Sequence, residues 1–175
     1  FINSNPDITN VTINANASIS DNGGGIYCNI SNPLFSIVTV SENEAANGGG
    51  FYCENNSNPV FENVIIHNNT SSNGGGAYFE ATNAVFRNVL LENNNVAVSG
   101  GGVVVNDGSL DIVNSTIVKN SAETDEGNGM TSNQSDVNIT NTIFWNSESN
   151  EISFESGSIS IIYSNIQGGW EGDNN

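Results

Sequence analysis

The segment GGGFYC at residues 48–53 indicates how this chain of 175 residues folds. It recurs as GGGIYC at residues 23–28, as GGGAYF at residues 74–79 and as GGGVVV at residues 100–105, so the glycine triplets begin 25, 26 and 26 residues apart. A degenerate copy, GNGM, lies at residues 127–130. Repeats of roughly 20 to 50 residues are typical of solenoids and propellers.

A second motif has the same period. It consists of an aliphatic residue, two variable residues and Asn, and its Asn residues lie 27, 26, 25, 26 and 26 positions apart. The six copies are INAN (13–16), VSEN (40–43), IHNN (66–69), LENN (91–94), IVKN (117–120) and IFWN (143–146). Two independent markers that share one period make the repeat a strong signal.

The repeats consist of short β-branched runs between Gly and Asn, and no stretch has the apolar period of a helix. A propeller blade needs roughly 40 residues, which excludes a propeller. The sequence therefore predicts an all-β chain, a right-handed parallel β-helix (solenoid) of about six to seven coils, with about 26 residues and three short strands per coil. We expect residues 1–175 to form a single β-helix domain that is a segment of a longer protein.

Equivalent residues of successive coils stack about 4.8 Å apart, so the sequence divides into inward and outward columns. One inward column is predicted at Ile13, Val40, Ile66, Leu91, Ile117 and Ile143. Another is predicted at Ile8, Phe35, Phe61, Phe86 and Ile112, and a third at Ile26, Phe51, Ala77 and Val103. Each fully buried side chain of this kind contributes about 1.5–3 kcal/mol, so these columns predict one continuous core.

The recurring polar positions of the repeat have structural explanations. Stacked Asn side chains form amide hydrogen-bond ladders, and Asn tolerates left-handed geometry at a corner. We predict one ladder at Asn16, Asn43, Asn69, Asn94, Asn120 and Asn146, and a partial second one at Asn10, Asn63, Asn88 and Asn114. The glycine triplets are predicted to be sharp corners that need positive φ.

Strand alternation predicts that Tyr27, Tyr52 and Tyr78 face outward. Exposed tyrosine rings can form a platform for a sugar or a protein partner, or they can stack on one another and shield the sheet. Another outward column contains Thr12, Thr39, Thr116 and Thr142, interrupted by Ile65 and Leu90. Threonine ranks on β-helices occur in ice-binding proteins, although the strand propensity of Thr also explains them.

Cys28 and Cys53 occupy the same column in successive coils. Their Cα atoms should lie about 5 Å apart, within the range of a disulfide, but in-register parallel strands make the disulfide dihedral angle awkward. Two buried thiols fit the same column. Both alternatives stay open from the sequence.

The charge balance excludes several kinds of partner. The chain has 19 acidic residues and two basic ones, Arg87 and Lys119, so it has no basic patch for nucleic acid or for an anionic membrane. It also has no apolar run long enough for membrane insertion. The acidic loop with Glu123, Asp125 and Glu126 is a weak candidate for a Ca²⁺ site, and a solvated loop is the alternative.

Catalytic residues do not converge in the sequence. Arg87 and Lys119 fall at different offsets in their coils, the carboxylates scatter over several columns, and His67 has no Ser or Cys nucleophile beside it. We therefore expect a chain that is not an enzyme and needs no cofactor. Because enzymes also use this scaffold, a fragment of a carbohydrate-active β-helix enzyme remains an alternative, as does an ice-binding module that uses the threonine column.

The run VTVSENEAANGGGFYC at residues 38–53 resembles the repeats of chlamydial polymorphic outer membrane proteins. Those repeats pair F-x-x-N with G-G-A-[ILV], and here I-x-x-N or L-x-x-N and G-G-G-[IFAV] replace the two motifs over roughly residues 8–146. The ending YSNIQGGWEGDNN at residues 163–175 is similar to segments of environmental bacterial β-helix proteins with C-terminal sorting domains. The resemblance implies the passenger of a surface-exposed or secreted bacterial adhesin.

Together, these observations predict a non-catalytic extracellular or cell-surface stalk or adhesin of bacterial origin. We expect its partner to be a glycan or a protein. The absence of visible polar caps predicts end-to-end self-association or a longer rod.

Overall fold

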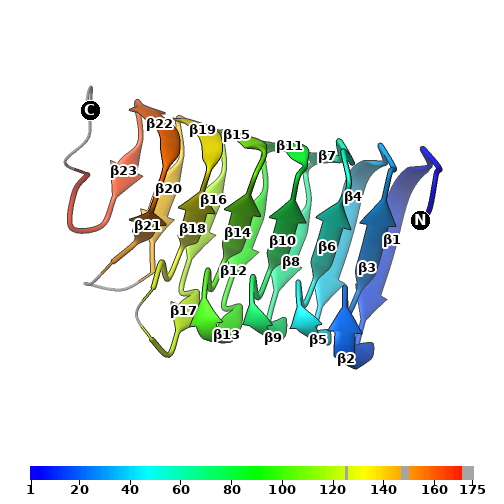
Figure 1. The fold of residues 1–175 in the computed structure, drawn as a ribbon. Helices are drawn as coiled ribbons and strands as arrows, with labels where there is room; N and C mark the ends of the chain where they lie inside the picture. Colours follow the sequence, from blue (N-terminus) through cyan, green and yellow to red (C-terminus); the bar gives the residue numbers. More distant parts are fainter. Residues whose placement is uncertain (125, 147–149, 171–175) are drawn as a thin grey trace.

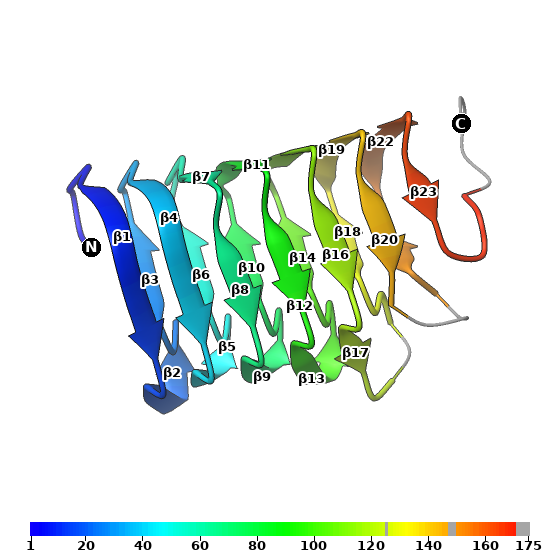
Figure 2. The same cartoon turned by 180° about the vertical axis from the view of Figure 1, so that it is seen from behind.

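Each turn of the chain lies parallel to the turn before it, and the turns stack into a β-solenoid (Figures 1 and 2). The computed structural model describes residues 1–124, 126–146 and 150–170. It is a right-handed parallel β-helix of about six turns with about 26 residues per turn, which confirms the predicted fold class. No helix long and apolar enough to cross a membrane occurs in the described residues.

The strands form three sheets that run along the length of the solenoid. The twelve-stranded sheet contains β1 (Asp7–Asn14), β4 (Leu34–Ser41), β7 (Val60–Glu62), β8 (Ile65–His67), β11 (Asn83–Arg87), β12 (Leu90–Glu92), β15 (Ser109–Val113), β16 (Thr116–Val118), β19 (Ser135–Thr140), β20 (Ile143–Trp145), β22 (Gly157–Ile162) and β23 (Asn165–Ile166). The six-stranded sheet contains β3 (Ile26–Asn29), β6 (Phe51–Glu54), β10 (Ala77–Glu80), β14 (Val103–Asn106), β18 (Met130–Asn133) and β21 (Ile152–Phe154). The five-stranded sheet contains β2 (Ala17–Asn22), β5 (Glu44–Asn47), β9 (Thr70–Asn73), β13 (Asn95–Ser99) and β17 (Ser121–Ala122).

The twelve-stranded sheet is bent along its length. The first half of β4 pairs with β7 and its second half with β8, so one strand of the second turn continues as two in the third. The division occurs at Asn63, whose φ of 56° turns the chain at that point. A complete turn such as β7–β8–β9–β10 therefore has four short strands, not the three that were predicted.

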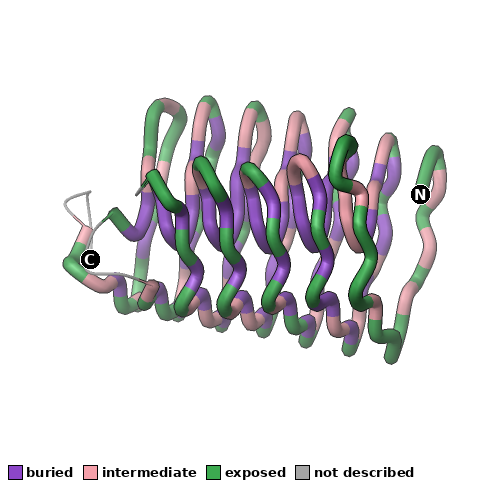
Figure 3. The backbone as a smooth tube through the Cα atoms, turned by 90° about the horizontal axis from the view of Figure 1, so that it is seen from below, coloured by how far each residue is buried: buried purple, intermediate pink, exposed green. Residues whose placement is uncertain are grey.

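The core is a continuous stack of apolar side chains inside the solenoid. Phe35 and Phe61 stack with ring centroids 5.2 Å apart, and Phe51 and Phe86 each meet Phe61 edge to face at 4.9 Å. These arrangements are the ones that aromatic pairs prefer. Figure 3 shows the buried segments along the solenoid, while no residue before Ile26 is buried.

The last inward position of the aliphatic column differs from the prediction. Ile117 pairs with Phe144, and Thr116 pairs with Ile143. Phe144 is fully buried, whereas 44% of Ile143 is exposed. The predicted alignment was one residue out of register here, and such a slip exchanges the inner and outer faces of a strand.

The first two glycines of a triplet have different roles. The first residue, as in Gly48 with φ of 65°, adopts the left-handed backbone that was predicted. The second approaches the next turn closely, because a Cβ atom on Gly49 would lie 2.7 Å from the carbonyl oxygen of Gly75. Positive φ therefore explains the first glycine, and close stacking of backbones explains the second.

Candidate functional site

Three tyrosines form a row on the outer face of the six-stranded sheet. Tyr27, Tyr52 and Tyr78 are in register on β3, β6 and β10, and their neighbours in each strand point into the core. The ring centroids of Tyr27 and Tyr52 are 5.9 Å apart and those of Tyr52 and Tyr78 are 5.2 Å apart, with interplanar angles of 6° and 16°. The rings therefore cover one another. Tyr52 is only 7% exposed, and the stacking agrees with the second of the two alternatives, in which the rings shield the sheet.

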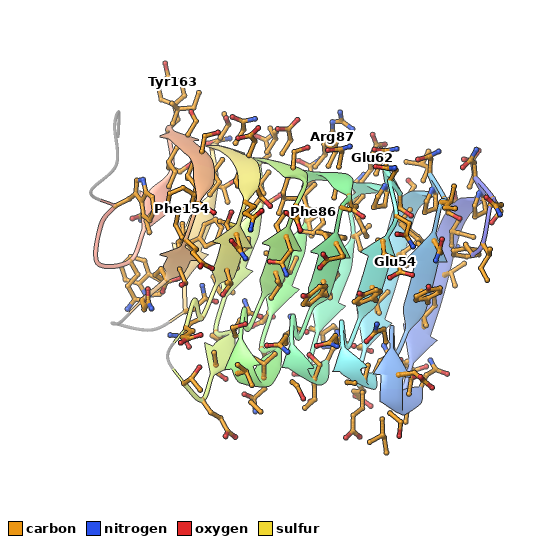
Figure 4. All side chains as sticks on the ribbon, viewed as in Figure 1. Glu54, Glu62, Phe86, Arg87, Phe154 and Tyr163 are labelled. Atoms are coloured by element: carbon orange, nitrogen blue, oxygen red, sulfur yellow. The ribbon has the colours of Figure 1, made fainter. Side chains whose placement is uncertain are left out.

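An acid–amide row, consisting of Asn29, Glu54, Glu80 and Asn106, runs beside the tyrosine row. These residues are two positions after the tyrosine column in the same strands, and Figure 4 labels Glu54 among them. The Glu54 carboxylate accepts hydrogen bonds from the hydroxyl of Tyr27 and from Nδ2 of Asn29, the latter at 2.7 Å. Asn106 Nδ2 donates to the hydroxyl of Tyr78 at 2.7 Å and to Glu80 Oε2 at 3.4 Å. We call the two rows together the tyrosine face.

Burial and the acidic neighbours keep these phenols protonated. Burial raises the pKa of Tyr52, and the negative charge of Glu54 raises it further. The pKa of Tyr78 is also raised, first by burial and then by the charge of Glu80. At neutral pH the face therefore presents hydroxyl groups that can donate hydrogen bonds beside carboxylates that can accept them.

The pair of adjacent carboxylates was missed in the sequence, where the acidic residues were expected to scatter. Cys53 and Phe79 are in register, and Glu54 and Glu80 are the next residues of the two strands. Their Cα atoms therefore lie about one strand spacing, roughly 4.8 Å, apart. Like charges at that distance repel one another, and the hydrogen bonds from Asn29 and Asn106 compensate on opposite sides. Numbering both residues from their glycine triplets would have revealed the pair.

The predicted asparagine ladder consists of side chains that hydrogen-bond from turn to turn, and its four middle members, Asn43, Asn69, Asn94 and Asn120, are buried. Each Nδ2 donates to Oδ1 of the next Asn at 2.8–3.0 Å, in the order Asn16, Asn43, Asn69, Asn94, Asn120 and Asn146. The left-handed residue of this corner precedes the ladder Asn, as at Asn68 and Asn93, so the predicted backbone role of the ladder residues is wrong. The ladder ends on Glu151, which accepts from the backbone N–H and Nδ2 of Asn146, both at 2.6 Å.

The threonine column is shorter than predicted. Thr12, Thr39 and Thr116 share one column, but Thr142 is buried and accepts a hydrogen bond from the backbone N–H of Ser115 at 3.3 Å. The one-residue slip in the sixth turn puts Ile143 in its place. The column is therefore interrupted by three large aliphatic residues, which are Ile65, Leu90 and Ile143.

Cys28 and Cys53 lie side by side in register, and both are free, fully buried thiols. The alternative of a disulfide is therefore wrong in this structure. In-register parallel strands point both Cβ atoms in the same direction, which fits two packed thiols better than an S–S bond. Burial raises the pKa of Cys53 well above its ordinary value, so this thiol is not an activated nucleophile.

The two basic side chains each pair with a carboxylate on a neighbouring turn. Arg87 lies 3.5 Å from Glu62, and the two are labelled side by side in Figure 4. Lys119 lies 2.9 Å from Glu92. Lys119 and Glu92 also line a hollow of about 280 Å³ with His67, whose Nδ1 is 2.9 Å from Nδ2 of Asn68. The sequence did not bring His67 and Lys119 together, because His67 shares its column with Glu92 and Val118, and Lys119 lies one residue beyond that column.

The weak Ca²⁺ candidate cannot be assembled from the described residues. Glu123 and Glu126 are exposed, and Asp125 lies outside the described residues. Within the described part of the chain, no group of three or more His, Cys, Asp or Glu side chains is arranged to hold a metal ion.

Comparison with protein families gives one match, to the model of the right handed beta helix region over residues 2–130. The comparisons with curated proteins and with solved structures found no match. The chain belongs to the right-handed β-helix family, which agrees with the parallel ladders described above.

Proposed function

We propose that this right-handed β-helix protein is a non-catalytic module of a bacterial cell-surface or secreted protein, which presents its tyrosine face to a glycan or protein partner. The observation that carries the proposal is the tyrosine face itself. It places phenol hydroxyls, two carboxylates and two amides in register on one flat sheet. Surface sites that combine aromatic rings with donors and acceptors suit both sugars and protein backbones.

The rest of the molecule supports a role as a rigid support. A buried amide ladder and backbone hydrogen bonds connect every turn to the next, so the face is held on regular strands and not on loops. Binding groups on rigid elements lose little conformational entropy when a partner binds. The resemblance to chlamydial surface repeats supports the adhesin role and the surface location.

Binding to a glycan array, followed by titration of the best ligand, tests the proposal. The double variant Glu54→Gln, Glu80→Gln keeps the size of both side chains and removes the charges, so we expect binding to weaken at least about tenfold. Glu44→Gln is the matched control, because Glu44 is an exposed carboxylate on the five-stranded sheet. Equal affinity of the double variant and the control would contradict the proposed face.

The alternative function is that of a carbohydrate-active enzyme, and the pair Glu54 and Glu80 is the observation that favours it. Glycosidases use two carboxylates about 5–10 Å apart, and adjacent turns provide that range. In this alternative, a neutral oligosaccharide that binds to the face is cleaved, and each single Glu→Gln variant abolishes cleavage while binding persists. Binding without release of reducing ends favours the non-catalytic proposal.

End-to-end association is a further part of the proposed role. The strands β1 and β2 pair with a neighbour on one side only, and their exposed Val11 and Ile19 lie at an edge that a second copy or further residues of a longer rod can cover. Open parallel edges are templates for further strands. Light scattering that shows a concentration-independent monomer would contradict this part without affecting the tyrosine face.

A further inference from the structure

A second aromatic site lies on the twelve-stranded sheet, at a corner where most turns have asparagine. The strand register aligns Tyr163 with one left-handed residue of each preceding turn. This corner column is Asn10, Ile37, Asn63, Asn88, Asn114, Asn141 and Tyr163. Tyr163 has φ of 51° and is 86% exposed, and its side chain projects away from the ribbon in Figure 4.

The structure shows no benefit to the fold from a tyrosine at this corner. Left-handed backbone is well tolerated by Asn and disfavoured by bulky side chains. The ring of Tyr163 is also left in water, where burial cannot offset that cost. Ile37 is also exposed at this left-handed corner, so strain alone does not single out Tyr163, and the surroundings of its ring carry the argument.

Tyr163 lines a hollow of about 390 Å³ on the outer surface of three successive turns, with Asn114, Asn141, Ile143 and Asn165 among the other lining residues. We call it the Tyr163 hollow. All of its side chains are uncharged, and 44% of Ile143 is exposed beside the ring. Its volume falls in the lower part of the range for small-molecule sites, which begins at about 300 Å³.

Amide groups in the hollow have hydrogen-bonding capacity to spare. Asn141 Nδ2 donates to Asn114 Oδ1 at 2.7 Å, which fixes both amide groups. Among the described residues, no partner accepts from Asn114 Nδ2 or donates to Asn141 Oδ1, so one donor and one acceptor remain for a ligand. The side-chain amide of Asn165 adds another donor and acceptor.

We propose that the Tyr163 hollow binds one unit of a neutral saccharide. The C–H face of a sugar ring packs on the negative face of the phenol ring, and its hydroxyls pair with the amides of Asn114, Asn141 and Asn165. The hollow has no cation for a uronic acid, and the net charge of −17 repels anionic polysaccharides. This site is on a different sheet from the tyrosine face, so it stands independently of the proposed function.

Titration of ¹⁵N-labelled protein with three neutral trisaccharides, maltotriose, cellotriose and N,N′,N″-triacetylchitotriose, tests the proposal, with trigalacturonate as the anionic control. We expect at least one neutral trisaccharide to shift the side-chain amide signals of Asn114, Asn141 and Asn165. Tyr163→Asn, which restores the common residue of the column, should weaken that binding about tenfold, and Tyr163→Phe, which keeps the ring, should not.

Ile37→Ala is the matched control, because Ile37 is an exposed apolar residue at the same corner of another turn. It should leave the affinity unchanged. The proposal is overturned if no neutral trisaccharide shifts these amides, if Tyr163→Asn binds as tightly as the native chain, or if trigalacturonate binds equally well. Binding at the tyrosine face would shift other signals, so the two sites are distinguishable.

Discussion

Replacement of Asn69 by alanine tests whether the buried ladder holds neighbouring turns together. The Asn69 side chain is fully buried and makes four hydrogen bonds. Its Nδ2 donates to the carbonyl oxygen of Val40 and to Oδ1 of Asn94, both at 3.0 Å. Its Oδ1 accepts from the backbone N–H of Asn43 at 3.0 Å and from Asn43 Nδ2 at 2.9 Å.

The expected loss follows from what remains of each partner. A hydrogen bond contributes about 1 kcal/mol net, and a buried group left without a partner costs about 1–3 kcal/mol. Asn94 Oδ1 still accepts from the backbone N–H of residue 69, and Asn43 Nδ2 still donates to Ile13 at 3.2 Å. The backbone N–H of Asn43 has no such second partner among the bonds described. We expect Asn69→Ala to lower the free energy of unfolding by about 4 kcal/mol.

Urea unfolding followed by far-ultraviolet circular dichroism measures this loss. The control is Asn58→Ala, because Asn58 makes the same type of amide contact to Asn32, at 2.7 Å, on the exposed surface. Water replaces its lost bonds, so we expect a cost below about 1 kcal/mol. Native-state hydrogen exchange at the Asn43 amide reports the local effect, which matters because solenoids unfold in segments. Equal costs for the two variants would refute the reasoning that burial makes the ladder strong.

Three further predictions concern single residues. Glu151→Gln should lower the urea midpoint and the free energy of unfolding, the latter by about 2 kcal/mol, because the glutamine oxygen is a single acceptor for the two donors of Asn146. An unchanged midpoint would show that the carboxylate does not terminate the ladder. The folded chain raises the pKa of Tyr52 above the ordinary value of 10.0, so the contribution of the protonated phenol to stability is complete below pH 10 and is lost as the pH rises further. Tyr52→Phe removes this titration and should flatten the decline of the urea midpoint between pH 9 and pH 12. An equally steep decline in the native chain and the variant would argue against this role of Tyr52. Tyr163→Asn should raise the free energy of unfolding by about 1 kcal/mol in the same assay, and a loss of stability would mean that the ring contributes to the fold.

The architecture could be predicted because its signals are periodic. Successive turns repeat a glycine that needs positive φ, such as Gly48, and an Asn that completes a ladder, such as Asn69. Both requirements arise from contacts between identical positions of adjacent turns, so they recur in the sequence at the period of the fold. The burial of Phe35, Phe61 and Phe86 in one column follows from the same period.

What could not be predicted depends on single residues and on neighbours outside the strand. The pair Ile143 and Phe144 satisfies an inward position in either register, so the apolar pattern could not reveal the slip that also buries Thr142. The burial of Tyr52 results from rings above and below it and not from its own strand. The pairing of Glu54 with hydroxyl and amide donors likewise depends on an adjacent turn.

In a solenoid each column defines the residue expected at the next turn, so a departure from its column needs a cause. Glu151 stands in the column of Gly102 and Gly129, and the cause of this departure is internal: the last two donors of the asparagine ladder need an acceptor, which a carboxylate supplies. Tyr163 and Ile37 both depart from the asparagine corner column and are exposed at a left-handed residue, but Tyr163, unlike Ile37, lines the hollow with the amides of Asn114 and Asn141. Where the protein itself provides hydrogen-bond partners for the polar atoms of the unusual residue, as at Glu151, the residue has a structural role. Where an aromatic ring and the adjacent amides are open to solvent, as at Tyr163, the reason for the residue lies outside the chain. We therefore place a ligand at the Tyr163 hollow and none at Glu151.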